Sequence, residues 1–408
     1  MICDLTKCMP SMLAGEALAR AMTILPEYDP AVRGKPASER LMELSSLYQL
    51  YLPSSMSLEI YSKLYLALMR SLRKKSSRNA ILQKYENLKA IRQQEYEGII
   101  GGSDSFTIIG VSGIGKSSAI SRSLALITGQ GVIELDEPYL KIIPCVVVQC
   151  PFDSSVKGLL LEILRKVDDQ LGGSYYQNAL KVKATVDMLI GSVSQVALNH
   201  IGLLVVDEIQ NVVNSKNGKS LIGMLTQLIN NSGISICMVG TPESTVFFEQ
   251  AMQLARRSLG LQYGKLEYDQ YFHDFCCKLY EYQYVRHKTA ITPAMVEWLY
   301  AHSSGVISVV VSLIHDAQEI AILNGTEELN QTALNEAYQK RLAMLHSYIQ
   351  PPPVKRQAAA PARKIVRTAQ KPVLGSVSIE ELASKAKTEK RDVVTLLREH
   401  MPVDEVII

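Results

Sequence analysis

The stretch Phe106-Thr-Ile-Ile-Gly-Val-Ser-Gly-Ile-Gly-Lys-Ser-Ser-Ala-Ile120 decides the fold of this chain. Its short apolar run ends at Gly110, and residues 110–117 fit the pattern G-x-x-x-x-G-K-[ST] of a phosphate-binding loop. β-branched residues precede the loop, as in a strand, and an amphipathic helical pattern follows it at 116–128. A glycine-rich turn without a ligand does not need these flanks, so the context predicts a site for a nucleoside triphosphate.

Each residue type in the loop has its own role in that prediction. The glycines let the backbone curl, so that successive N–H groups point at phosphate oxygens. Lys116 places a cation on the β- and γ-phosphates, and the hydroxyl of Ser117 is suited to Mg²⁺. The positive end of the following helix points at the same anion. We therefore expect ATP and Mg²⁺ as cofactors, bound by Gly110, Gly113, Ile114, Gly115, Lys116, Ser117 and Ser118.

The composition sets bounds on the class of protein. The chain has 408 residues, 47% of them hydrophobic and 20% charged, with a formal net charge of +3. These values describe an ordinary globular protein, and the net charge is too small to indicate a partner. No apolar run approaches a membrane span, and Asp4 and Lys7 interrupt any signal-peptide pattern, so we expect a cytoplasmic protein without membrane contact. Seven cysteines, an odd number without zinc-site spacing, argue against a disulfide framework and against a metal cluster.

Strand and helix patterns alternate after residue 99. Near-continuous apolar runs, as in parallel strands covered on both faces, lie at 106–109, 144–150, 201–206 and 234–239. Helical patterns fall at 156–172, 185–200 and 219–231, which predicts a three-layer α/β domain. Later residues carry only helical periodicity, at 293–301, 306–323 and 330–346.

These patterns divide the chain into six parts. Four prolines break up the beginning of the chain, two helices are expected at 56–75 and 78–97, and the segment from 351 is rich in Ala, Pro, Lys and Arg. The expected parts are an N-terminal segment at 1–55, a helical extension at 56–98, the ATPase core at 99–290, a helical lid at 291–350, a basic disordered linker at 351–377 and a docking helix at 378–408.

A second motif, Leu203-Leu-Val-Val-Asp-Glu208, places two carboxylates after an apolar run. Asp207 at a strand end would hold Mg²⁺ next to Ser117, and Glu208 could orient or deprotonate the attacking water. The same pair could instead cap a helix. Because the phosphate-binding loop lies upstream, the hydrolytic interpretation is favoured, and the two motifs together predict hydrolysis of ATP to ADP and phosphate.

Two further features follow the strand at 234–239. Thr241 comes directly after it and would project between the two nucleotide motifs, although a simple strand-ending turn explains it almost as well. Arg256 and Arg257 come about 15 residues later. Adjacent arginines are commonly solvated, but here one of them, undecided between the two, could stabilise transition-state charge in a neighbouring subunit. An arginine that acts on the nucleotide of a neighbouring subunit requires a ring or helical assembly.

The order of these motifs, followed by a helical region, resembles the AAA+ ATPases. Within them the chain is similar to the transposition regulators called TnsC and TniB, from Tn-type and CRISPR-associated transposons. The resemblance covers roughly residues 50–345. Besides the loop at 110–117, it rests on Gln149-Cys-Pro-Phe-Asp-Ser-Ser-Val-Lys-Gly158, Val206-Asp-Glu-Ile-Gln-Asn211, Gly240-Thr-Pro-Glu243 and Ala255-Arg-Arg257.

The resemblance implies an ATP-dependent homo-oligomer, a ring or filament, that wraps double-stranded DNA, marks the target site and recruits the transposase. It implies DNA contacts at the starts of two helices, here Lys157, Lys181, Lys183 and Thr185. Lysines, a hydroxyl and helix N-terminal amides contact phosphates without reading bases. By analogy, the N-terminal segment would dock a target-selection protein, and the C-terminal helix would dock the transposase.

One departure and two alternatives accompany this interpretation. Many AAA+ proteins place an arginine in the lid that reaches the phosphates, but residues 303–311 contain none, so hydrolysis is expected to be slow or assembly-dependent.

The alternatives are an ATP-driven loader of the replicative helicase and a nucleotide-switched scaffold that binds only proteins. The Lys157 and Lys183 pair and the basic tail favour the two DNA-binding functions, and the 149–158 phrase favours the transposition regulator.

Overall fold

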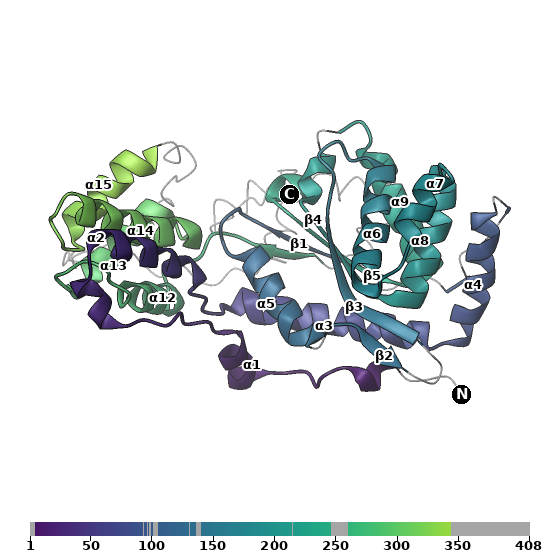
Figure 1. Cartoon of the computed structure of the whole chain (residues 1–408), viewed down its shortest axis with the longest axis horizontal. Coiled ribbons are helices and arrows are strands. Elements are labelled where there is room, and N and C mark those ends of the chain that lie inside the picture. The colour runs from purple at the N-terminus through teal and green to yellow at the C-terminus, as the bar shows by residue number, and fades with distance from the viewer. Residues whose placement is uncertain are drawn as a thin grey trace, which may run out of the picture. The chain divides into compact units, whose positions relative to one another are not determined.

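Six strands form one sheet whose order sets the position of each sequence motif (Figure 1). The computed structural model describes residues 5–343 except 93, 96, 98, 101–104, 130, 136–139, 214 and 246–259. The order is β2-β3-β4-β5-β1-β6, and all neighbouring pairs are parallel except β2 and β3. The strands are β1 (Phe106–Gly110), β2 (Ile133–Leu135), β3 (Leu140–Gln149), β4 (Ile201–Asp207), β5 (Ser235–Gly240) and β6 (Leu261–Tyr263).

The central strands are buried on both faces, because alternate side chains of a strand point in opposite directions. Leu204 and Val206 pack in the same core as α6 (Val156–Leu171), α8 (Val186–His200) and α9 (Gly218–Ser232). Leu203 and Val205 pack in a second core with α3 (Ser55–Lys75) and α5 (Lys116–Thr128). The two helical layers enclose the sheet, so the predicted three-layer α/β fold class is confirmed.

The predicted helices between the strands begin and end within one residue of α5, α6, α8 and α9. β3 begins four residues earlier than predicted, because its first residues pair with β2. Pro144 lies within the strand, beyond the residues that pair with β2. α4 (Arg78–Ile91) is shorter than the predicted helix at 78–97, since the chain folds back and the Glu97 amide donates to the carboxylate of Glu86. Two helices, α7 (Tyr175–Lys181) and α12 (Gln270–Tyr280), and the short strands β2 and β6 were not predicted.

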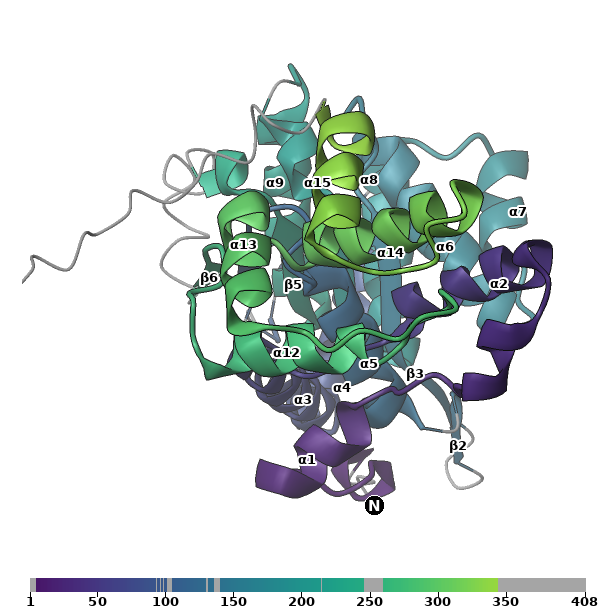
Figure 2. The same ribbon diagram turned by 90° about the vertical axis from the view of Figure 1, so that its left-hand side faces the viewer.

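Helices α12 to α15 pack together (Figure 2), and their side chains share a separate apolar core. α13 spans Pro293–Ser303, α14 Ile307–Leu323 and α15 Gln331–Arg341, so three helices lie where helical periodicity was predicted; from here on, the lid means α12 to α15. No single helix among the described residues is long and apolar enough to cross a membrane; α13 and α14 pass that test only as a pair bent by 119°. The expected linker at 351–377 and docking helix at 378–408 lie outside the described residues.

The N-terminal segment contributes to two of these cores, the one between the sheet and α3 and α5, and the one of the lid helices. The short helices here are η1 (Leu5–Cys8), α1 (Gly15–Met22), η2 (Pro30–Gly34), α2 (Ala37–Glu43) and η3 (Leu44–Gln49). Leu18 and Met22 of α1 are buried with α3 and α5, whereas Leu44 and Leu47 are buried with the lid helices. Several residues of the segment assigned to partner docking are therefore core residues of the same compact unit as the sheet and the lid, whereas most of the segment is exposed or half-buried.

A buried ion pair fastens this segment to the lid. The guanidinium of Arg40, 1% exposed, donates two 2.6 Å bonds to the carboxylate of Glu327 and one of 2.9 Å to the carbonyl of Tyr284. Arg40 lowers the pKa of the Glu327 carboxyl, and the Arg286 amide adds a further hydrogen bond to the same group. Bidentate pairs of this kind are strong because both charges keep hydrogen-bond partners in place of water.

We expect Arg40→Met to destabilise the protein by about 3 kcal/mol, because it leaves a largely buried carboxylate without its partner. Urea denaturation at pH 7 measures the loss. Since the pKa of Glu327 is lowered in the folded state, the contribution of the pair is complete above the ordinary value of 4.5 and disappears as pH falls through the lowered one. The difference between wild type and variant should therefore shrink in acid.

The exposed pair Lys35–Glu39 gives a matched control, because both side chains are about half exposed. Lys35→Met should cost less than about 1 kcal/mol. Equal losses for the two variants would contradict a special role for the Arg40 pair.

Candidate functional site

One cavity of about 400 Å³ brings the separated motifs together. Its walls include the loop after β1, Asp207 at the end of β4 with the following Glu208, and Thr241, which directly follows β5. The carboxyl ends of parallel strands meet at one edge of a sheet, and this edge is where α/β proteins bind ligands. The predicted residues that line the cavity are Gly113, Ile114, Gly115, Lys116, Ser117, Ser118, Asp207, Glu208 and Thr241.

The loop has the backbone conformation that its glycines were expected to supply. Gly113 and Gly115 have φ values of 81° and 98°, a region that side chains rarely adopt. Gly115 is the N-cap of α5, so the first amides of that helix face the cavity without a side-chain cap. Ile114 differs from its prediction in one respect: its side chain is buried in the core of α3 and α5, and only its backbone is available to a phosphate.

Lys116 is folded back onto its own loop. Its ammonium group donates to the carbonyls of Gly110 at 2.6 Å and Val111 at 2.9 Å, and the residue is 8% exposed. Burial lowers the pKa of Lys116, while the carboxylates of Asp207 and Glu208 oppose that shift. The loop therefore holds a partly desolvated cation with only carbonyl partners, which is favourable for an incoming polyphosphate.

The sheet order explains how the carboxylates and Thr241 reach the loop. β5 lies between β1 and β4, so Thr241, which follows β5, lies between the loop and the pair Asp207–Glu208. The carboxylate of Asp207 accepts from the amide of Glu208 at 2.8 Å. Glu208 is the N-cap residue of the short helix η4 (Ile209–Val212), without a side-chain cap bond of its own, and Asp207 satisfies its amide, so the structure contains part of the capping alternative as well.

Gln210 was missed by sequence reasoning, although it lies within a quoted motif. Its Nε2 donates to the carboxylate of Glu208, and its Oε1 accepts from the amide of Thr241 at 3.3 Å. The side chain thus connects the predicted base to the predicted γ-phosphate contact. Only the strand order reveals this role, because Thr241 lies 31 residues further along the chain.

An apolar and aromatic part of the cavity lining was also missed. It comprises Tyr48, Leu50, Tyr51 and Leu52 of the N-terminal segment and Tyr271 and Ile307 of the lid. The hydroxyl of Tyr51 donates to Ser57 and that of Tyr271 to the carbonyl of Leu52, so both polar tips are satisfied. Apolar and aromatic side chains in the same cavity as a phosphate-binding loop match the two kinds of group in a nucleotide.

Comparison with known proteins identifies part of the chain. Residues 79–262 match the model of the family described as Bacterial TniB protein. The match covers less than half of the chain. The matched range contains the phosphate-binding loop, both carboxylates and Thr241. The predicted resemblance to the TniB family is therefore confirmed over this range, whereas no curated protein matches the chain.

Solved structures resemble the chain only distantly. They include the Aeropyrum pernix ORC1 protein in complex with DNA (16% identity, 64% of each chain covered, TM-score 0.39). Drosophila ORC bound to DNA matches with 13% identity over 96% of this chain and 82% of that one (TM-score 0.43). The Thermotoga maritima RuvB branch migration motor matches with 11% identity over 84% and 86% (TM-score 0.37). The first of these chains is thus spanned over less than two thirds of its length, and likenesses this weak say nothing about what this chain binds.

The oxygens needed for a magnesium ion are present in the cavity. The exposed hydroxyl of Ser117 and the carboxylate of Asp207 line the same cavity. Mg²⁺ prefers oxygen ligands and combines one or two protein groups with substrate phosphates, so these residues fit the ion. When bound with the nucleotide, it would neutralise phosphate charge.

The residues predicted to contact DNA are all exposed, but only Lys157, Lys183 and Thr185 lie at the starts of helices; Lys181 differs from its prediction, because it is the last residue of α7. α6 follows β3 after a short turn, and α8 leads directly into β4. Both helices therefore run antiparallel to these strands and begin at the edge of the sheet that carries the cavity. Lys157 lies in the first turn of α6, and Lys181 ends α7. Lys183, with φ of 50°, precedes Thr185, whose hydroxyl caps α8 by accepting from Met188.

Two predictions concern arginines. Arg256 and Arg257 lie outside the described residues. The lid residues that line the cavity, among those described, are Tyr271, Phe275, Ile307, Ser308, Val311 and Ser312, and none of them is basic. The lid instead contacts the loop through its backbone, because the Ser308 amide donates to the carbonyl of Gly113 at 3.0 Å.

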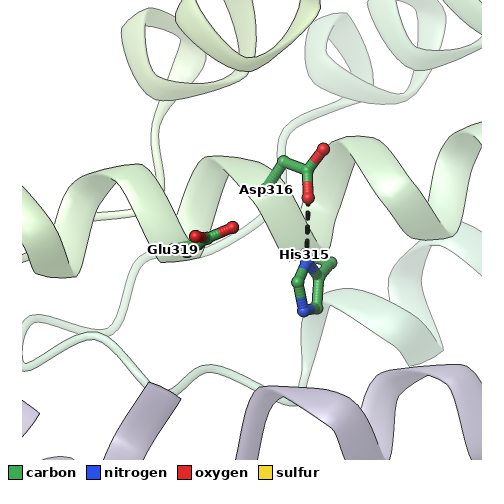
Figure 3. Close-up of side chains that lie close together, drawn as sticks. All are labelled: His315, Asp316 and Glu319. Atoms are coloured by element: carbon green, nitrogen blue, oxygen red, sulfur yellow. Dashed lines mark hydrogen bonds and ion pairs between the residues drawn. The ribbon is translucent and has the colours of Figure 1, made fainter. Parts of the chain in front are cut away.

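A cluster on α14 has the composition of a metal site (Figure 3). The ligand atoms of His315, Asp316 and Glu319 lie within 4.8 Å of one another. His315 Nδ1 is 2.8 Å from the carboxylate of Asp316, and Arg341 donates to Glu319 at 3.3 Å. The guanidinium already pairs with one carboxylate and would repel a cation, so hydrogen bonding and ion pairing account for the cluster.

We expect Gly113→Ala to weaken ATP binding at least tenfold. The added Cβ would lie against the Ser308 hydroxyl and 2.9 Å from Val306, at a φ that alanine avoids, with strain of about 1–3 kcal/mol. Gly223→Ala is a matched control, because Gly223 is an exposed residue of α9 with no atom near the added Cβ. Calorimetric titration with ATP measures both variants, and unchanged affinity of the Gly113 variant would contradict the loop–lid contact.

Proposed function

We propose that this protein is an ATP-dependent, DNA-binding oligomer that regulates transposition, with slow ATP hydrolysis as its disassembly switch. One observation carries the proposal: within the segment that matches the TniB family, the phosphate-binding loop, Asp207, Glu208 and Thr241 meet around a single cavity. The family match favours a transposition regulator over a helicase loader or a scaffold without DNA.

The residues of the cavity support a hydrolytic reaction. Lys116 and the loop amides bind the β- and γ-phosphates, and Thr241 faces the same region. Glu208 orients a water and accepts its proton as the water oxygen bonds to the γ-phosphorus. The bond between that phosphorus and the β–γ bridging oxygen breaks, which releases ADP and phosphate. Mg²⁺ held by Ser117 and Asp207 supplies charge neutralisation when it is bound.

The aromatic part of the cavity lining supports a purine base as the remainder of the ligand. Tyr51 lines the cavity together with Leu50, Leu52 and Ile307 of the lid. Burial raises the pKa of Tyr51, so its ring remains neutral at physiological pH. Because the N-terminal segment and the lid both line the cavity, nucleotide binding would fix their relative position.

Assembly and DNA contact extend the proposal. Either Arg256 or Arg257 would reach the γ-phosphate of a neighbouring protomer, and this contact requires a ring or filament. Two neighbouring helix starts with Lys157, Lys183 and hydroxyl caps present amides and cations suited to DNA phosphates. Such contacts bind duplexes without reading sequence, as a target marker requires.

The termini would provide the contacts with other transposition proteins. We propose that the C-terminal helix at 378–408 docks the transposase through the linker at 351–377, and that exposed parts of the N-terminal segment meet a target-selection protein. A CRISPR-associated transposon is one setting in which such target selection operates. Pull-down of each partner with the full chain and with a chain ending at residue 350 tests the first contact.

Glu208→Gln should bind ATP normally, lower the rate of hydrolysis by about 10²–10⁴ and trap the assembled state, because the base is lost while the phosphate site is intact. Phosphate release measures the rate, and electron microscopy with duplex DNA and ATP shows the assembly. Lys116→Ala is the companion variant that should neither bind ATP nor assemble. A Glu208 variant with wild-type turnover would disprove the assignment of the base.

Lys157→Glu combined with Lys183→Glu should weaken binding to duplexes of any sequence and reduce the salt dependence of log K by about 2, since two phosphate contacts are lost. ATP affinity should be unchanged. Lys265→Glu with Lys288→Glu reverses the same number of exposed charges elsewhere and is the control. Fluorescence anisotropy at several salt concentrations measures binding; equal losses in both double variants would remove Lys157 and Lys183 from the interface.

A further inference from the structure

Gln210 uses both ends of its side-chain amide on the two groups that flank the reacting phosphate. The donor end binds the carboxylate of Glu208, and the acceptor end binds the amide of Thr241 at 3.3 Å. Gln210 also lines the cavity, so these bonds form at its wall. A change in the position of this one side chain would therefore move the base relative to the end of β5.

The backbone of Glu208 depends on these neighbours. Glu208 has a φ of 57°, a left-handed conformation that a non-glycine residue keeps only where its surroundings fix it. Its amide donates to the carboxylate of Asp207 at 2.8 Å, and its own carboxylate is held by Gln210. The direction of the carboxylate is thus set from two sides, one of which is Gln210.

Asn211 connects the same segment to the β3–α6 turn, which we define as residues 150–155. Its side-chain Nδ2 donates to the carbonyl of Cys150 at 2.9 Å, and its own carbonyl accepts from the hydroxyl of Ser154 at 3.1 Å. Ser154 is fully buried and has a φ of 52°. The turn is therefore locked, through Asn211, to the residue that follows Gln210.

The β3–α6 turn is rigid but presents an apolar side chain to solvent. The carbonyl of Asp153 accepts from the hydroxyl of Ser215 at 2.8 Å and from the amide of Asn217 at 3.1 Å. In spite of this bracing, Phe152 is 88% exposed. These bonds and those of Asn211 tie the turn to the segment that carries Gln210.

We propose that Gln210 is a positioning residue for hydrolysis, and that Asn211 makes the position of Gln210 depend on what the β3–α6 turn contacts. In this chain the ligand of the turn is duplex DNA, whose proposed contact Lys157 lies two residues after the turn. DNA bound at the turn moves Asn211, the adjacent Gln210 shifts, and the Glu208 carboxylate changes its direction. The inference rests on the proposed ATP hydrolysis.

The first test compares Gln210→Met, Gln210→Glu and wild type in steady-state ATP hydrolysis by the full chain. The methionine variant keeps the volume and loses both hydrogen bonds, so kcat should fall on the order of tenfold with KM within about twofold. The glutamate variant keeps the acceptor for Thr241 but places a second carboxylate against Glu208. It should therefore be slower than the methionine variant, although it is closer to glutamine in shape.

The second test adds duplex DNA. The rate in the wild type should change on addition of a saturating duplex, and Asn211→Asp should abolish that change, because aspartate cannot donate to the carbonyl of Cys150. Gln170→Met, on the exposed last turn of α6, is the control for a glutamine substitution in the same chain. Circular dichroism verifies that each variant is folded.

The outcomes separate this inference from the proposed function. If the wild type binds ATP but shows no turnover, the proposed hydrolysis fails and the inference fails with it. If the wild type turns over and both Gln210 variants match it, or raise KM alone, only the positioning role is overturned. A DNA effect that is absent in the wild type, or persists unchanged in Asn211→Asp, overturns the link through the turn.

Discussion

The parallel pairing of β3, β4, β5 and β1 is the constraint on which the remaining structure depends. Because the strands run in the same direction, their carboxyl ends meet at one edge, and three segments separated by up to 130 residues line one cavity there. The position of β5 between β1 and β4 brings Thr241 between the loop and Glu208. No local feature of any one segment could produce this arrangement.

The sequence predicted the central α/β region well because burial determines its pattern. Strands covered on both faces are continuous apolar runs, and the intervening helices carry one apolar stripe, so their bounds could be read closely. The misses have physical reasons. β2 and β6 are three residues long and carry little periodicity, and the N-terminal segment is buried through scattered side chains instead of regular helices.

The site was predictable only where its chemistry lies in consecutive residues. The loop at 110–117 and the pair Asp207–Glu208 were found from their spacing, and the cavity contains them. Gln210 could not be assigned, because its partner Thr241 is adjacent only in the folded sheet. The aromatic part of the lining could likewise not be predicted, since Tyr51 and the lid residue Ile307 line one cavity only in the folded chain.

The lid has a consequence for the order in which the chain can reach its native state. Its core joins residues near position 40 to residues beyond position 320, and the Arg40–Glu327 pair closes that junction. During synthesis, the early half of this core must wait, with Leu44 and Leu47 uncovered, until almost the entire chain has left the ribosome. The α/β region, whose strands and helices lie between these ends, can fold first.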